Sequence, residues 1–306
     1  MAPEPGSPAE KAGILPGDVI TDIDKHWVIA YDPRLDLNKL HTVNYEDKVY
    51  RDAWKEATRK LTDGISLQKA LDQLNGPDGK TLSLTVERPG VKTPLKLSIV
   101  TAQTNVNPVE FQEISPDVAY IRINQFNDAS VTAIHDDLAK MKQKDLILDL
   151  RNNPGGPVIS SQTGAMSAMM SLLSSLHVSG QIGTLVKKGD VQENLQVTSQ
   201  PGEAVKIAVL INHGTANLAE LAAAVLKDKA GADLIGQQSF GDSVYQKLIP
   251  LQDGAAMTIR AGKLLAPKGF DFTGKGLKPD MIVSDDTAIG PGDKTVQVAV
   301  NKLTGA

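Results

Sequence analysis

Side chains that can act as nucleophiles or bases gather in one stretch of the 306-residue chain, residues 213–243. His213 carries an imidazole, and Thr215 and Ser243 carry hydroxyls. A hydroxyl becomes a nucleophile when a nearby base removes its proton, so a histidine-assisted Thr215 or Ser243 is one hypothesis. The competing interpretation is that His213 is solvated at the surface, which is the more frequent state of a lone histidine in a turn.

The elements that would position these side chains follow one another as strand, tight turn and helix. Residues 207–211 predict a buried strand, 212–215 a sharp turn, and 216–229 a helix with apolar side chains on one face. A second strand is predicted at 232–236. This order directs backbone N–H groups and one side chain at a common point, as in a nucleophile elbow. It also occurs wherever a helix packs on a strand, which is the more frequent case when the stretch is taken alone.

A second turn lies earlier in the chain and could supply hydrogen-bond donors. Residues 145–150 predict a buried strand, and a Pro-Gly-Gly turn follows it. The N–H groups of Gly155 and Gly156 are exposed in such a turn and can form half of an oxyanion hole, with the amide of Leu218 as a further candidate. A rigid turn without a chemical role is the alternative. For Arg151, beside this turn, we expect a structural ion pair.

Four motifs surround these turns. The first is Asn212-His213-Gly214-Thr215-Ala216-Asn217-Leu218-Ala219-Glu220, and the second is Ser239-Phe240-Gly241-Asp242-Ser243-Val244-Tyr245-Gln246. Residues 149–156 have the sequence D-L-R-N-N-P-G-G, and residues 274–280 have G-K-G-L-K-P-D. The four resemble the motifs N-x-G-S-A-S-A-S-E, (S/T)-F-G-K-G-(S/T)-V-Q, D-L-R-x-N-x-G-G and G-x-G-(I/L)-x-P-D of the carboxyl-terminal processing, or tail-specific, serine peptidases.

The resemblance implies which positions would carry the chemistry. The family has a serine nucleophile at the position of Asn217, a lysine general base at that of Asp242, and a glutamine that orients the base at that of Gln246. Both catalytic residues are therefore replaced in this chain. An amide is a poor nucleophile, and a carboxylate lacks the proton affinity of lysine. We expect Asn217 and Asp242 to satisfy each other through an amide-to-carboxylate hydrogen bond, with Gln246 only structural.

Residues 6–20 carry a further motif, G-S-P-A-E-K-A-G-I-L-P-G-D-V-I. Ser7 is expected to cap a short helix, and 19–23 to form a strand. The motif resembles the central signature of a PDZ domain of the bacterial protease type. PDZ domains bind the C-terminal end of a polypeptide as an added strand. The strand and glycine loop that hold its carboxylate precede this motif in the family, so the resemblance implies a PDZ-like domain with a truncated first strand.

Residues 25–63 depart from the PDZ pattern and predict an insertion. The stretch holds both tryptophans and three of the five tyrosines, and residues 49–61 predict an amphipathic helix. An aromatic-rich insertion could contact a partner or a substrate. A small satellite core that covers the PDZ domain is the more frequent arrangement. The PDZ pattern then resumes with a helix capped by Ser66 and with strands over 81–88 and 95–101.

The rest of the chain predicts an alternation of strands and helices. The expected elements are strand 118–123, helices 129–142 and 158–176, a polar hairpin or loop over 178–201, strands 247–251 and 256–260, and a closing helix over 295–303. Met166, Met169 and Met170 lie on the second of these helices. Methionines at helical spacing more often fill a core than form a binding surface.

Composition limits the classes of function. A net charge of −4 argues against nucleic acid and charged membranes as partners, and no apolar run approaches the roughly 20 residues of a membrane-spanning helix. The chain has no cysteine, which excludes disulfides and thiolate metal sites. Its five histidines lack the spacing of metal ligands, and we expect neither a metal nor a cofactor. No signal peptide is present, and we expect that a targeting segment has been removed.

Together these features predict an α/β protein with two domains: a PDZ-like domain at 1–104 and a crotonase/Clp-like peptidase core of mixed sheets and helices at 105–306. The leading hypothesis is a catalytically inactive homologue of the tail-specific peptidases that binds polypeptide C-termini or a partner protein. The alternatives are an active serine-type endopeptidase with a rearranged site, and a scaffold or assembly protein that uses the insertion. The resemblance implies an exported location, in the periplasm or cell envelope. A homo-oligomer is also compatible with the sequence.

Overall fold

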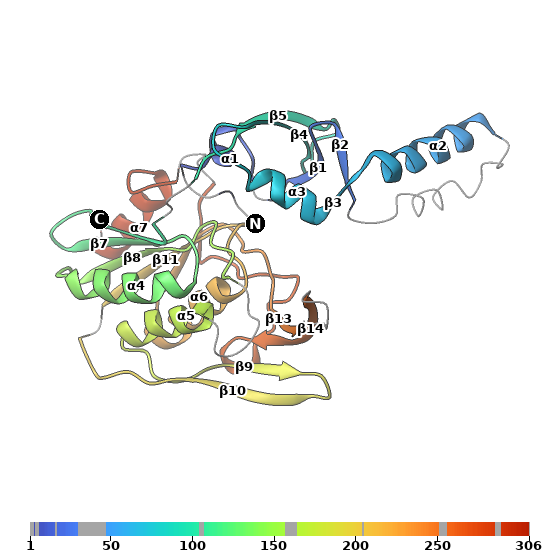
Figure 1. Cartoon of the computed structure of the whole chain (residues 1–306). Coiled ribbons are helices and arrows are strands. Elements are labelled where there is room, and N and C mark those ends of the chain that lie inside the picture. The colour runs from blue at the N-terminus through green and yellow to red at the C-terminus, as the bar shows by residue number, and fades with distance from the viewer. Residues whose placement is uncertain are drawn as a thin grey trace. The chain divides into compact units, whose positions relative to one another are not determined.

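The structure, a computed structural model, divides the chain into two compact units, Pro3–Val106 and Asn107–Ala306 (Figure 1). It describes residues 3, 6–15, 17–29, 47–103, 107–156, 164–203, 205–250, 256–284 and 289–305. Both units combine helices with sheets, which confirms the predicted α/β class. Across the described residues, no helix is both long and apolar enough to cross a membrane.

The N-terminal unit is built on one five-stranded sheet with the strand order β3-β2-β1-β4-β5. Its strands are β1 (Val19–Ile23), β2 (His26–Ile29), β3 (Ile65–Ser66), β4 (Thr81–Glu87) and β5 (Leu95–Val100). The helices α1 (Pro8–Lys11) and α3 (Leu67–Leu74) accompany the sheet. Ser7 and Ser66 cap these helices, as predicted, because each hydroxyl accepts a hydrogen bond from the backbone N–H three residues later.

The stretch expected as an insertion, 25–63, begins with a strand of this sheet. β2 pairs antiparallel with β1, and its Trp27 is buried. The rest of the described stretch is α2 (Lys48–Asp63), the predicted amphipathic helix, which leads away from the sheet (Figure 1). Ala57 is the one buried residue of α2, and Trp54 stays 46% exposed. Residues 30–46, with two of the tyrosines, lie outside the described residues. Residues 26–29 of the expected insertion thus belong to the sheet of this unit.

A six-stranded sheet with the order β15-β12-β11-β8-β7-β6 forms the centre of the C-terminal unit. Its strands are β6 (Val109–Glu113), β7 (Val118–Ile123), β8 (Asp145–Asp149), β11 (Lys206–Ile211), β12 (Asp233–Gly236) and β15 (Met281–Ile282). All neighbours are parallel except the edge strand β6, which pairs antiparallel with β7. Every residue of β7 and β8 is buried. Helices cover both faces of such a sheet, so its strands appear in the sequence as apolar runs.

The helices of this unit pack on both faces of the sheet. They are α4 (Asp128–Lys140), α5 (Gly164–Ser175), α6 (Leu218–Ala230) and α7 (Lys294–Thr304). The first three share the larger hydrophobic core with one face, and α7 forms a second core with the other. Met166 and Met169 of α5 are buried in the larger core, which confirms the prediction that they fill it. The predicted start of that helix, at 158–163, lies outside the described residues.

A separate four-stranded sheet has the order β10-β9-β14-β13. Its strands are β9 (Gly180–Lys187), β10 (Val191–Val197), β13 (Val244–Pro250) and β14 (Ala256–Leu265). β9 and β10 form the hairpin predicted at 178–201, and β13 and β14 form the next predicted strand pair. The loop 237–243 joins β12 of the larger sheet to β13 of this one. The two sheets therefore fix this loop, which carries Asp242, at both of its ends.

Candidate functional site

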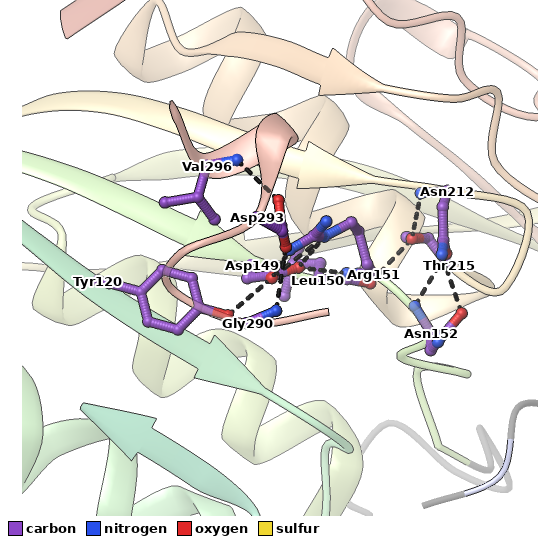
Figure 2. Close-up of polar contacts among 10 residues, drawn as sticks. All are labelled: Tyr120, Asp149, Leu150, Arg151, Asn152, Asn212, Thr215, Gly290, Asp293 and Val296. Atoms are coloured by element: carbon purple, nitrogen blue, oxygen red, sulfur yellow. Dashed lines mark hydrogen bonds and ion pairs between the residues drawn. The ribbon is translucent and has the colours of Figure 1, made fainter. Parts of the chain in front are cut away.

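The two predicted turns lie side by side because they follow β8 and β11, which are parallel neighbours. We call residues 150–156 the first turn and residues 212–217 the elbow. Hydrogen bonds join them directly (Figure 2). The bonds run from Asn152 N to Asn212 Oδ1 (2.9 Å), from Asn212 Nδ2 to Asn152 Oδ1 (2.9 Å), from Thr215 Oγ1 to Leu150 O (2.8 Å) and from Ala216 N to Asn153 O (2.9 Å). The first turn thus holds the elbow in one conformation.

Asn217 stands at the apex of the elbow in a backbone conformation that L-residues rarely adopt. Its φ is 51° and its ψ is −115°, and α6 begins at the next residue. The predicted helix start at 216 is therefore two residues early, because Asn217 is not helical. Gly155 of the first turn lies against this apex: a Cβ there would be 2.4 Å from Leu218 N and 2.5 Å from Ala216 O. Glycine at this position lets the two turns approach each other.

Glu220, at the start of α6, ties the elbow to the loop that carries Asp242. The side chain is fully buried, and each carboxylate oxygen accepts two hydrogen bonds. Oε2 accepts from the N–H of Asn217 at 3.0 Å and from that of Asp242 at 2.9 Å. Oε1 accepts from the N–H of Gly241 at 2.7 Å and from the Ser239 hydroxyl. We call Glu220 with its four donors the Glu220 junction. It brings the backbones of Asn217 and Asp242 to one carboxylate.

Glu220 is absent from the predicted site residues, although its position carries a signal. It is the third residue of α6, where a glutamate typically reaches back to the N–H of the capping residue. Burial raises the pKa of the Glu220 carboxyl to about 7, while its hydrogen-bond donors act to lower that pKa. These donors, the Ser239 hydroxyl and three backbone N–H groups, are all uncharged.

The side chains of Asn217 and Asp242 meet at Val244 rather than at each other. Asn217 Nδ2 donates to the Val244 carbonyl at 3.1 Å, and Asp242 Oδ1 accepts from the Val244 N–H at 2.9 Å. The predicted amide-to-carboxylate bond is therefore wrong, because the backbone of Val244, at the start of β13, supplies a hydrogen-bond partner for each side chain. Asn217 Oδ1 is buried and has no hydrogen-bond partner among the described residues. Asn217 Oδ1 is therefore a hydrogen-bond acceptor at the apex that no described donor engages.

One of the three predicted oxyanion-hole donors is already engaged. The Gly155 N–H donates to Asn153 Oδ1 at 2.7 Å. The N–H groups of Gly156 and Leu218 have no hydrogen-bond partner among the described residues. Leu218 is the first residue of α6, where a helix leaves its N–H groups unpaired. An oxyanion hole built from Gly156 and Leu218 stays a prediction.

The two alternative nucleophiles are fully buried. Thr215 Oγ1 donates to the first turn and accepts from a backbone N–H of the elbow. Ser243 Oγ lies 2.6 Å from Thr273 Oγ1, and either hydroxyl can be the donor. His213 is exposed, and none of the described contacts joins its ring to either hydroxyl. Gln246 is exposed on β13. The structure therefore brings Asn217 and Asp242 together and leaves His213 and Gln246 outside their contacts.

The predicted structural ion pair of Arg151 is confirmed. Its side chain is 1% exposed, and Nη2 lies 2.6 Å from both Asp149 Oδ2 and Asp293 Oδ2 (Figure 2). The Tyr120 hydroxyl donates to Asp149 at 2.8 Å. Burial acts to lower the pKa of the Arg151 guanidinium, but the two carboxylates outweigh it and raise that pKa. We call these four residues the Arg151 cluster, which fastens the N-terminus of α7 to the end of β8.

The apex of the elbow is surrounded by groups that can form hydrogen bonds. Its apex carries an amide, with the Leu218 N–H at the helix start and two carboxylates, Glu220 and Asp242, in the surrounding contacts. In the part of the chain that the structure describes, no three His, Asp or Glu side chains gather as metal ligands would. Such a site can bind the polar groups of a polypeptide. Hydroxyls and thiols are the usual nucleophiles of acyl transfer, and Asn217 at the apex carries neither.

The comparisons with known proteins agree with this geometry. Residues 117–283, more than half of the chain, match peptidase family S41, and residues 1–31 match a PDZ domain. The chain is 30% identical over 292 residues to the carboxyl-terminal-processing protease of Picosynechococcus sp.. It is 29% identical over 290 residues to the carboxy-terminal-processing protease of Bartonella bacilliformis. These matches cover 94% and 92% of this chain but 60% and 57% of the relatives, so the chain spans about three fifths of their length.

Two solved structures share the fold. The photosystem II D1 C-terminal processing protease has a TM-score of 0.71 at 24% identity, over 96% of this chain and 70% of that one. A putative S41 protease from Bacteroides fragilis has a TM-score of 0.55 at 17% identity, over 99% of this chain and 76% of that one. Likeness at this level of identity concerns the fold alone. The family match itself extends over both turns and the Glu220 junction, and the chain therefore belongs to peptidase family S41.

Proposed function

We propose that this chain binds polypeptides or a partner protein without cleaving them. The observation that carries the proposal is the apex of the elbow. There Asn217 presents an amide in a strained conformation, and the motif resemblance implies that this is the position of the nucleophile in a serine peptidase of this family. A peptidase of this type forms an acyl intermediate on a hydroxyl. An amide cannot form that intermediate, whereas it can hydrogen-bond to the backbone of a bound polypeptide.

The surroundings of Asn217 support the same proposal. A general base must accept a proton from the nucleophile, and a basic amine does so when burial lowers its pKa. Asp242 offers a carboxylate instead, which already accepts a hydrogen bond from the Val244 N–H. The hydroxyls of Thr215 and Ser243 are buried and hydrogen-bonded, so nothing in their geometry favours a rearranged active site.

The relatives suggest the chemistry of the partner. They are named for carboxyl-terminal processing, and the first 31 residues of this chain match a PDZ domain. Domains of that kind bind the C-terminal end of a polypeptide as an added strand. We infer that polypeptide C-termini are the ligand class. We also propose an exported location, in the periplasm or cell envelope, in line with these bacterial relatives.

The test compares the parent chain with Asn217→Ser/Asp242→Lys on an unfolded protein that ends in an apolar tail. We expect the parent to bind the labelled tail without cleaving it. The double variant restores both side chains that the family's chemistry needs, and cleavage by it would show that the backbone frame is intact. Asn217→Ala/Asp242→Lys is the matched control, because it carries the lysine without the hydroxyl and should stay inactive.

Two results would overturn the proposal. The first is cleavage by the parent that disappears in Thr215→Ala or Ser243→Ala, which would identify a replacement nucleophile. The second is a failure of the parent to bind any tail peptide with a free carboxylate, measured by fluorescence anisotropy. Inactivity of the double variant would not contradict the binding function. It would mean that the backbone around residues 217 and 242 no longer has the geometry that catalysis needs.

A further inference from the structure

The C-terminal unit contains a cavity of about 1030 Å³ outside the candidate site. Parts of α6, β12 and the segment 266–278 line it, and Asn217, Asp242 and Gly155 do not. Its volume lies at the upper end of the usual range for ligand pockets, roughly 300–1,000 Å³. Four of the side chains that line it are lysines, and we call it the lysine-rimmed pocket.

The floor of the lysine-rimmed pocket is apolar. Leu234, Ala266 and Leu277 line it and are buried. Phe270 also lines it, and its side chain remains 48% exposed. A large apolar side chain that stays half exposed beside a cavity can gain burial when a ligand packs on it. The floor therefore suits one aliphatic or aromatic side chain.

The rim carries an excess of positive charge. Two of its lysines are paired, Lys227 with Asp280 at 2.5 Å and Lys268 with Asp228 at 2.6 Å. Lys275 and Lys278 are exposed and have no carboxylate partner among the described residues. Two unbalanced positive charges thus face one cavity, in a chain whose net charge is −4. A ligand with negative charges would be attracted to this rim.

We propose that the lysine-rimmed pocket binds an acidic segment of a polypeptide that includes one large apolar side chain. The apolar side chain packs on the floor beside Phe270, and the acidic side chains pair with Lys275 and Lys278. The inference rests on the proposed function and names a class of polypeptide for it. It differs from capture of a C-terminus, since the lysines recognise acidic side chains anywhere in a sequence.

The wall of the pocket is joined to the Glu220 junction through Ser239. The Leu277 N–H donates to Ser239 Oγ at 2.6 Å, and Ser239 Oγ donates to the Glu220 carboxylate. Gly276 packs so closely that a Cβ on it would collide with the Ser239 carbonyl oxygen. A segment held in the pocket is therefore anchored on the same framework that positions the elbow.

The test measures the fluorescence anisotropy of a labelled Asp-Glu-Leu-Phe-Asp-Glu peptide, ending in an amide, with the whole chain. The amide removes the terminal carboxylate that a PDZ groove recognises, so binding reports on the side chains. We expect Lys275→Ala/Lys278→Ala to weaken binding about tenfold, because each exposed ion pair contributes a few-fold in affinity. Lys206→Ala/Lys229→Ala is the matched control. It removes two exposed lysines that do not line the pocket and should leave the affinity unchanged.

Two further variants separate charge from apolar contact. Lys275→Glu/Lys278→Glu should abolish binding of the acidic peptide and permit binding of its Lys-Lys-Leu-Phe-Lys-Lys counterpart. Phe270→Ser should weaken binding of the acidic peptide several-fold. It should leave the decline of affinity with added salt unchanged, because the lysines that cause this decline remain.

The inference fails if the acidic peptide binds no better than its Asn-Gln counterpart, or if the pocket variant and the control variant bind equally well. The inference also fails if the chain self-associates and Lys275→Ala/Lys278→Ala abolishes this self-association. A second copy of the chain would then occupy the lysine-rimmed pocket. Binding of a tail peptide with a free carboxylate, without binding of the amidated acidic peptide, would sink this inference and leave the proposed function standing.

Discussion

Two charged side chains are buried beyond the carboxyl ends of neighbouring strands, and their charges are balanced in different ways. In the Arg151 cluster, after β8, a guanidinium lies 2.6 Å from each of two carboxylates. In the Glu220 junction, after β11, a carboxylate accepts hydrogen bonds from three backbone N–H groups and one hydroxyl, without a cation. Both side chains are at most 1% exposed. Counterions balance the charge of Arg151, whereas the dipoles of hydrogen-bond donors stabilise the charge of Glu220.

The difference separates a permanent charge from one that can be lost. A guanidinium stays protonated in proteins, so the Arg151 cluster keeps its ion pairs over a wide range of pH. The Glu220 carboxyl has its pKa raised to about 7, because burial outweighs its hydrogen-bond donors. The frame of the site thus rests on a fixed charge, whereas the link between Asn217 and Asp242 rests on a titratable group.

The largest effect is expected from Arg151→Met, which removes the fixed charge. Asp149 and Asp293 would remain buried without their cation, and removing one partner of a buried ion pair typically destabilises a protein by about 3–5 kcal/mol. The free energy of unfolding, from denaturant titration, should fall by this amount. Lys263→Ala, which breaks an exposed pair with Asp271, is the control and should change it by less than about 1 kcal/mol. Equal losses would mean that the Arg151 cluster contributes no more than a surface pair.

The next effect concerns the pH dependence of stability. The pKa of Glu220 is about 7 in the folded chain against an ordinary value of 4.5, so the folded state binds this proton more tightly. Protonation of Glu220 in the folded state therefore adds at most about 3 kcal/mol to the free energy of unfolding. This stabilisation is fully present below about pH 4.5 and is lost as the pH rises through about 7. Denaturant titrations at a series of pH values should show this decline, and Glu220→Gln should abolish it.

Glu220→Gln should also lower the stability below about pH 4.5, by about 2–3 kcal/mol, because its amide NH₂ would face groups that are themselves donors. Glu193→Gln is the matched control, since the Glu193 side chain is 40% exposed and pairs with Lys187. That variant should retain the decline with pH. A parent chain whose stability instead rises between pH 5 and 8 would show that the four donors hold Glu220 ionised and that the two charge sites behave alike.

Asp242→Lys should make the Glu220 junction more like the Arg151 cluster. A cation close to a carboxylate lowers its pKa by about 1–3 units. The midpoint of the pH-dependent decline should therefore move down by about one unit or more, and an NMR titration of the Glu220 carboxyl should follow it. Asp242→Asn removes the negative charge without adding a cation, so its shift should be smaller. Identical titrations of both variants would mean that the lysine turns away from Glu220.

The smallest effect is expected at the apex of the elbow. Asn217→Gly relieves the φ of 51° and removes the unpaired Oδ1, although it gives up the bond to the Val244 carbonyl. We expect a net gain in stability of about 1 kcal/mol, measured by thermal unfolding. Asn217→Ala keeps a Cβ in the same conformation and should be about 1 kcal/mol less stable than Asn217→Gly. Equal stability of the two variants would mean that the backbone at 217 is unstrained.

Much of the framework of the site was predictable from local sequence. β8 and β11 are short apolar runs flanked by turn residues, and a parallel sheet buried on both faces needs such runs. Ser66 and Ser7 mark helix starts because a hydroxyl just before a helix pairs with a free N–H. The family resemblance supplied the positions of Asn217 and Asp242, which spacing alone does not distinguish from other polar residues.

The partner of Asn217 could not be read from spacing, because Asn217 bonds to the Val244 carbonyl across 27 residues, which is a tertiary contact. Asp242 instead bonds to the Val244 N–H two residues later, a local contact that Asp side chains often make and that the motif comparison did not consider. β2 was missed for a local reason. Its hairpin with β1 turns through Asp24 and Lys25, both with positive φ, whereas the usual signal for such a turn is a glycine. Glu220 was overlooked because its burial depends on the loop 239–242, which arrives later in the chain.

The bonds between the first turn and the elbow also bear on the order in which the chain folds. Asn152 and Asn212 are 60 residues apart, and Thr215 and Leu150 are 65 apart, so a long loop must close before these bonds form. Helix α6 needs only local contacts and can form earlier. We expect the apex at Asn217 to take its conformation late, after β8 and β11 have paired. Substitutions there should therefore change the rate of unfolding and leave the rate of folding nearly unaltered.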